Sequence, residues 1–213
     1  MRSVPETHET FDVATEALLT VAVRPEFRVE QAPSPQRLAP RSFTLTAEAI
    51  EGSGSHTVGA LSDSATGRFV ILHDPDGVDE WEGSYRVVIF ARCDVEPELL
   101  SDPLVHEVAW SWVTEALDDR RIAQLGGTVT ISSGTSFGTM AERPGDGLVE
   151  IRASWTPLLG SSSETQPDMN VQDLVSSLTE HMRVWIDILA KLAGLPPVPP
   201  GVSTLAGYRT QQS

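Results

Sequence analysis

The sequence contains almost no lysine. Lys191 is the only one, the other 14 basic residues are arginines, and 30 acidic residues bring the net charge to -15. A chain with this charge is repelled by phosphate backbones and by anionic membrane surfaces. The composition therefore argues against nucleic-acid binding and against attachment to a membrane.

Cysteine and long apolar runs are equally scarce. Cys93 is the only cysteine, so neither an internal disulfide nor a cluster of thiolate metal ligands can form. No segment provides the roughly 20 consecutive apolar residues that span a bilayer. The N-terminus lacks the pattern of a secretory signal, because Glu16 interrupts its apolar stretch. We expect a soluble cytoplasmic protein, and no motif in the chain calls for a cofactor.

Apolar periodicity predicts three helices and five strands. Helical spacing covers residues 10–23, with Thr10 as cap, and residues 104–117 and 171–194. The apolar stripe of the first helix is Phe11, Ala14, Ala17, Leu18, Val21 and Ala22. The buried side expected for the second is Leu104, Val105, Val108, Ala109, Trp112, Val113, Ala116 and Leu117. Alternating or β-branched segments predict strands, at residues 42–50, 67–73, 84–94, 127–133 and 148–155. Residues 24–42 contain four prolines and four arginines, and we interpret them as an extended connector.

The order of these elements is helix, three strands, helix, two strands, helix. It predicts an α+β domain of two layers, an antiparallel sheet of about five strands with helices packed on one face. We expect a flexible N-terminus at residues 1–9, a single domain at 10–202 and a disordered tail at 203–213. The proline-rich end of the domain, LPPVPPG, is interpreted as a rigid segment folded back on the domain.

An acidic stretch, HDPDGVDEWEG at residues 73–83, raises the question of a cation site. A calcium loop needs oxygen ligands at positions 1, 3 and 5, glycine at 6 and glutamate at 12. Counted from Asp74, position 5 is Val78 and position 12 is Tyr85, so the template fails. Pro75 and Gly77 favour a turn between two strands instead. A metal-dependent enzyme that uses the acids at 74–82 remains an alternative.

A second motif, GTSFG at residues 134–138, matches the G-x-S-x-G pattern of a nucleophile elbow. Ser136 would be the nucleophile, Asp146 or Asp168 the acid, and His181 the base. The pattern requires a helix directly after the serine, but here another strand is predicted. A small hydrolase is therefore an alternative hypothesis only.

Charge and tryptophan point to a binding surface. Between Asp74 and Asp119 there are 13 acidic residues against two arginines, which predicts an acidic face able to attract a basic partner. Trp110 and Trp112 cannot share one face of a helix. We place Trp112 in the core and Trp110 at a partner contact. The candidate partner-binding residues are Trp110, Asp79, Glu80, Trp81 and Glu82.

Four separated blocks resemble a family of actinobacterial proteins of unknown function, DUF3000. The blocks are RFVILHDPDGVDEWEGSYRVV, VEPELLSDPLVHEVAWSWVTEAL, IRASWTPL and AGLPPVPPGV. The resemblance covers roughly residues 10–202 and implies no catalytic residues. The order of elements is also similar to that of small acidic secretion-chaperone-like proteins, which dimerise and hold partner polypeptides.

These observations favour a non-enzymatic module, protein-binding or chaperone-like, with an acidic surface. Its expected partner is a basic protein or another polypeptide, and a homodimer is a further hypothesis. The alternatives are the hydrolase that uses Ser136 and the metal-dependent enzyme that uses the loop at 74–82.

Overall fold

The computed structural model describes residues 4–50, 65–159 and 171–197. Its helices are α1 (Val4–Leu18), α2 (Val105–Leu117) and α3 (Val171–Leu192). Its strands are β1 (Phe27–Gln31), β2 (Arg41–Ala49), β3 (Thr66–Val78), β4 (Gly83–Val95), β5 (Ile122–Gly134) and β6 (Asp146–Pro157). Short 3-10 turns lie at Asp79–Trp81, Pro97–Ser101 and Gly138–Met140.

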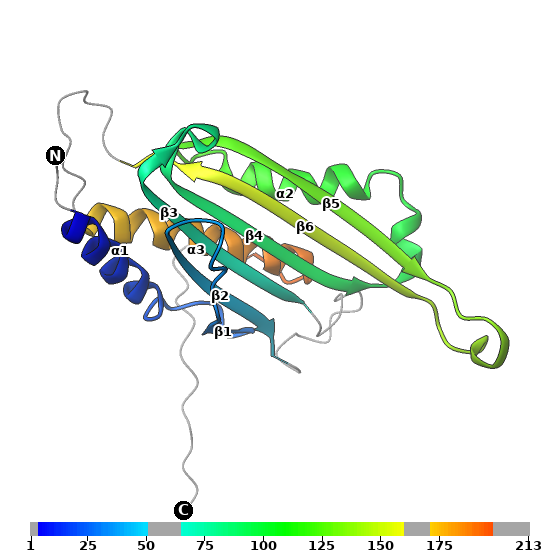
Figure 1. The fold of residues 1–213 in the computed structure, drawn as a ribbon. Helices are drawn as coiled ribbons and strands as arrows, with labels where there is room; N and C mark the ends of the chain where they lie inside the picture. The colour runs from blue at the N-terminus through cyan, green and yellow to red at the C-terminus, as the bar shows by residue number, and fades with distance from the viewer. Residues whose placement is uncertain (1–3, 51–64, 160–170, 198–213) are drawn as a thin grey trace, which may run out of the picture.

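The strands form one antiparallel sheet in the order β1-β2-β3-β4-β6-β5, and the helices lie on one of its faces (Figure 1). This confirms the predicted α+β architecture. The sheet has six strands, however, rather than about five.

The strand missing from the prediction is β1, which lies inside the supposed connector. It pairs with β2 from Phe27 opposite Ala49 to Gln31 opposite Leu45, and Phe27 is buried. The prolines that suggested a connector flank this strand without interrupting it, because Pro25 precedes it and the others follow it. Proline removes a donor only at its own position, so five residues free of it can still pair.

Helix α1 differs from the prediction at both ends. It begins at Val4 and ends at Leu18, so Thr10 lies inside the helix and does not cap it. Part of the predicted apolar stripe is confirmed, since Phe11, Ala14 and Leu18 are buried, whereas Val21 and Ala22 lie beyond the end of the helix. Residues 4–9, expected to be a flexible terminus, are part of this helix.

The hairpin of β3 and β4 is confirmed, with Phe69 opposite Ile89 and Ile71 opposite Val87. Its turn lies further along the chain than the sequence indicates. β3 continues to Val78 through an irregularity after His73, and the chain reverses over the 3-10 turn Asp79–Trp81. Gly77 does take the positive φ expected of it, at 78°.

Helix α3 covers the middle of the sheet and supplies much of the core. Trp185 stacks on Phe69 with ring centroids 5.6 Å apart, and its Nε1 donates a hydrogen bond to the Phe90 carbonyl at 3.1 Å. Half of the helix is buried, as its period of three and four predicts. The buried residues are Leu174, Leu178, His181, Met182, Val184, Trp185, Ile186, Ile188, Leu189, Ala190 and Leu192.

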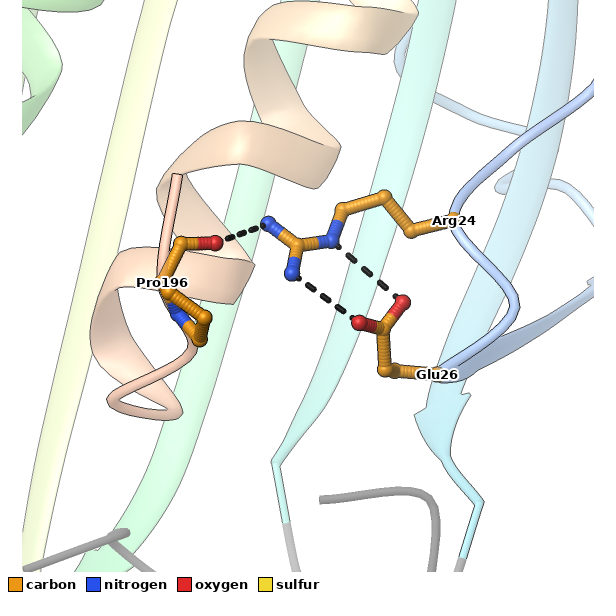
Figure 2. A network of polar contacts seen from close by, with 3 residues as sticks. All are labelled: Arg24, Glu26 and Pro196. Atoms are coloured by element: carbon orange, nitrogen blue, oxygen red, sulfur yellow. Dashed lines mark hydrogen bonds and ion pairs between the residues drawn. The ribbon is translucent and has the colours of Figure 1, made fainter. Parts of the chain in front are cut away.

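One arginine connects the segment after α3 to the segment that leads into the edge strand β1 (Figure 2). Arg24, just before β1, donates from Nη1 to the Pro196 carbonyl at 3.0 Å and from Nη2 to Glu26 Oε1 at 3.1 Å. Burial alone would raise the pKa of Glu26, but the hydrogen bonds and charge of Arg24 outweigh it and the net pKa is lowered. The first prolines of LPPVPPG are thus held against the domain, while residues 198–202 lie outside the described chain.

Helix α2 sits close to β5 because a glycine makes room for it. A Cβ on Gly127 would overlap the Arg152 carbonyl and would meet the Trp110 ring at 2.7 Å. At the neighbouring Gly126 a Cβ would meet nothing within 4 Å. Trp110 therefore packs directly on the backbone of β5.

We predict that Gly127→Ala lowers the free energy of unfolding by about 2 kcal/mol, because β5 must move away from both the Arg152 carbonyl of β6 and the Trp110 ring of α2 to admit the methyl group. Gly126→Ala is the matched control and should change it by less than about 1 kcal/mol. Denaturant unfolding followed by far-UV circular dichroism measures both. Equal effects of the two substitutions would contradict the close approach of Arg152 and Trp110 to Gly127.

Candidate binding surface

The acidic stretch at 74–82 forms a tip of the β3–β4 hairpin. Asp76, Asp79, Glu80 and Glu82 are exposed, whereas Trp81 is half-buried and its carbonyl accepts a 2.5 Å hydrogen bond from Thr156 Oγ1. No group of three or more His, Cys, Asp or Glu side chains within the described residues could hold a metal ion. The arrangement is that of a solvated turn fastened to the end of β6.

The hydrolase residues are not brought together. Ser136 follows the end of β5, where Gly134 pairs with Asp146 at the start of β6. His181 contacts Trp155 near the other end of β6. Nine residues of strand separate Asp146 from Trp155, which is about 30 Å at roughly 3.3 Å per residue. Asp168 lies outside the described residues, and no proton can pass directly between Ser136 and His181.

His181 is instead a buried structural residue. Trp155 Nε1 donates a hydrogen bond to His181 Nδ1 at 3.1 Å, which leaves the ring proton of the neutral imidazole on Nε2. Burial, helped by the charge of Arg120, lowers the pKa of His181 to about 4. Cys93 is equally inert, since burial and the neighbouring Asp94 raise its thiol pKa to about 12.

The two tryptophans of α2 lie on opposite flanks of the helix. Trp110 packs over Gly127 of β5, and Trp112 faces a hollow on the side of α3. Both are half-buried, so the predicted division into one core and one exposed tryptophan is not what the structure contains.

Apolar side chains of α2 and of the turn before it are exposed beside Trp112. Leu104, at the N-cap, and Val108 were assigned to the buried side, but 55 % and 46 % of their surface is exposed. Leu99 in the 3-10 turn Pro97–Ser101 is exposed to 45 %. Of the predicted stripe, Ala109, Val113 and Leu117 are buried, and at 100° per residue they lie along the side of it opposite to Leu104 and Val108.

Leu99 and Val108 line an apolar groove, a cavity of about 140 Å³ between α2 and the end of α3. We call it the α2 groove, and it is lined by Val95, Leu99, Leu100, Asp102, Val105, Val108, Ala109, Trp112, Val149 and Leu192. Its volume is close to that of an engineered cavity that binds benzene, so one leucine or phenylalanine side chain would fill it. Asp102 is the one charged residue in this described lining.

An open acidic hollow of about 1270 Å³ adjoins the α2 groove, and Val95 and Leu99 line both. Among the described residues that line it, the charged ones are Asp94, Glu96, Glu98 and Asp146, with Arg92 as the one cation. An apolar site therefore continues into a negatively charged one. This combination suits an apolar side chain followed by cationic ones.

The width of the apolar face of α2 indicates this surface, although the direction of the face alone does not. The apolar residues of α2, from Leu104 to Leu117, cover more than half of the helix circumference at 100° per residue. A helix on the edge of a domain buries a narrower stripe than that. Leu104 and Val108 lie beyond the width that such a helix can bury, which indicates an exposed apolar flank.

The fold and these surfaces define a two-layer α+β domain with an exposed apolar groove and an acidic rim. A family model described as a protein of unknown function, DUF3000, matches residues 7–203, so the chain belongs to this family. Comparison with curated proteins and with solved structures gave no match. Among the described helices, none combines the length and hydropathy required to cross a bilayer.

We predict that His181 makes the protein less stable in mild acid. The folded pKa of about 4 lies below the unfolded value of about 6.5, so the unfolded state binds the proton first and stability falls as the pH drops from 6.5 to 4. At pH 5 the loss attributable to His181 is about 2 kcal/mol. Denaturant unfolding of wild type and His181→Gln at pH 7 and pH 5 measures it.

The variant should lose less stability than wild type between the two pH values, whatever its stability at pH 7. His106→Gln, at an exposed position of α2, is the control and should retain the full pH dependence. The same pH dependence in His181→Gln and wild type would contradict a buried neutral imidazole.

Proposed function

We propose that the protein binds a polypeptide segment that carries an apolar anchor followed by basic residues. The α2 groove would take the anchor, and the acidic hollow would take the basic residues. The observation that supports this function most directly is the continuity of the two sites, which share Val95 and Leu99. The role is non-enzymatic, and its energy comes from apolar burial and charge complementarity.

The exposed apolar residues support a binding role because no described segment of the chain covers them. Leu99, Leu104 and Val108 lie together at one end of α2. Apolar side chains gathered around a concave site mark contacts with a partner more often than isolated ones do. Burial of the exposed part of each side chain by a partner would stabilise the complex.

The charge around the groove selects for a cationic partner. Glu98 and Glu107 are exposed beside Leu99 and Val108 in the chain, and Asp102 lines the groove itself. The only lysine of the protein, Lys191, is already paired with Glu115 at 3.2 Å. A basic segment would gain long-range attraction, whereas an acidic one would be repelled.

The hairpin tip with Asp79, Glu80, Trp81 and Glu82 is a less favourable contact surface. Its carboxylates are exposed, but Trp81 is partly covered, and the β3–β4 tip lies at the opposite end of β4 from Val95. Trp110 is also less suited to a partner contact, because β5 covers part of its ring. The proposed site therefore moves from these five residues to the α2 groove.

The test uses a short fluorescein-labelled peptide that carries one leucine anchor followed by several arginines, measured by fluorescence anisotropy. We expect the wild type to bind it, and to bind a version with glutamates in place of arginines much more weakly. Val108→Arg should weaken binding of the basic peptide by at least about tenfold, or about 1.4 kcal/mol, because it fills the groove and adds a like charge.

Val13→Arg is the matched control, since Val13 of α1 is also a valine exposed to 46 % but lies away from the groove. It should bind as the wild type does. Equal binding by Val108→Arg and wild type, or no binding of the basic peptide by the wild type at about 100 μM, would refute the proposed site.

A further inference from the structure

Strand β5 is an edge strand with one side unpaired within the described part of the chain. It runs over thirteen residues, Ile122–Gly134, and only β6 pairs with it. The strand at the other edge, β1, has five residues, of which Arg28 and Glu30 are charged. Short length and charge protect an edge from pairing with another chain, so β1 is protected and β5 is not.

β5 lacks the usual protective residues altogether. It contains no charged residue and no proline, although 21 % of the whole chain is charged. Its pairing with β6 is irregular only between Ala123 and Gly126, where Gln124 has a φ of 51°. From Gly126 to Gly134 the strand is regular, so its outer backbone groups can be matched by a second regular strand.

The segment Thr128–Ser132 is complementary to itself in an antiparallel arrangement. With a two-fold axis at Thr130, Val129 lies opposite Ile131 of a second copy, and Thr128 lies opposite Ser132. Val129 and Ile131 are on the helix side of the sheet, where they pair with the buried Ile151 and Val149. The self-pairing therefore keeps apolar residues on one face and hydroxyls on the other, as a stable register requires.

Burial indicates that the apolar side of this strand is incomplete. Val129 and Ile131 are only half-buried, while their neighbours on β6 are buried. A second β5 beside them would cover their open side and bring an apolar residue against each. The threonines and Ser132 on the other face would contact hydroxyls of the second copy.

Charge favours this strand over other surfaces for contact between identical chains. Two copies with a net charge of -15 each repel one another, and most of their surfaces would place carboxylates face to face. β5 contributes no charge to its own contact. The remaining repulsion acts over longer distances and is screened beyond about 10 Å at 0.1 M salt.

We propose that the protein forms a symmetric homodimer in which β5 pairs antiparallel with β5 of a second copy, with the two-fold axis at Thr130. The two sheets of six strands then become one continuous sheet of twelve. The α2 groove lies on the other flank of α2 from this contact, because Trp110 marks the β5 flank and Trp112 the groove flank. The acidic hollow of the proposed function adjoins the contact, because Ser132 and Ser133 of β5 also line it.

Sedimentation velocity of the full chain over a range of concentrations tests the dimer. The wild type should approach twice 23.0 kDa, more readily at 0.15 M salt than at low salt. Thr130→Lys and Thr130→Asp should each dimerise at least about tenfold more weakly, because each places two like charges opposite one another at the axis. Thr130 is exposed, and far-UV circular dichroism would verify that both variants fold.

An equimolar mixture of Thr130→Lys and Thr130→Asp should recover the dimer, because lysine then faces aspartate. This recovery distinguishes the proposed axis from any general effect of charge on the chain. Gln31→Lys, an exposed position on the other edge strand, is the control and should dimerise as the wild type does. A monomeric wild type at about 100 μM, undiminished dimers of both Thr130 variants, or no recovery in the mixture would overturn the proposal.

Discussion

The seating of Trp185 on the sheet is the contact on which the arrangement of the other elements depends. Its Nε1 donates to the Phe90 carbonyl, and its ring lies against Gly67, where a Cβ would stand 2.9 Å from Nε1. The glycine lets α3 approach β3 and β4 closely, and the hydrogen bond fixes the position of the helix along them. The two sides of α3 then receive α1 and α2, so a displaced Trp185 would leave all three helices without a defined position.

The α2 groove follows from a mismatch of length between α2 and β5. Each has thirteen residues, but a helix rises about 1.5 Å per residue and a strand about 3.3 Å. α2 therefore spans less than half of the strand it covers, and the β5–β6 hairpin extends past the helices (Figure 1). The α2 groove lies at the beginning of the helix, next to the part of the sheet that the helix does not cover, and Val108 lines it.

The sequence allowed the centre of the fold to be predicted better than its edges. In α3 and in the β3–β4 pair, neighbouring elements cover the apolar residues that the period marks, so period and burial agree. β1 is not predicted because its five residues are too few to show an alternating apolar pattern among the nearby prolines. The strand also depends on pairing with β2, which the local sequence does not reveal. The helical period of α2 was recognised, but Leu104 and Val108 were assigned to the core. Periodicity gives the direction of an apolar face, whereas its buried width depends on how far the neighbouring elements extend.

Sites on opposite flanks of α2 have a consequence for how the protein would bind. In the β5 dimer, the Trp110 flank of each helix faces the two-fold axis and the flank with Trp112 faces away from it. Both α2 grooves would therefore remain open and would be related by the same axis, whereas the acidic hollows, which Ser132 and Ser133 of β5 also line, would lie beside the paired strands. A polypeptide with two apolar and basic segments could occupy both, and its second contact would form at a high effective concentration. Two weak contacts, each in a groove of about 140 Å³, would then suffice for the dimer to retain a partner.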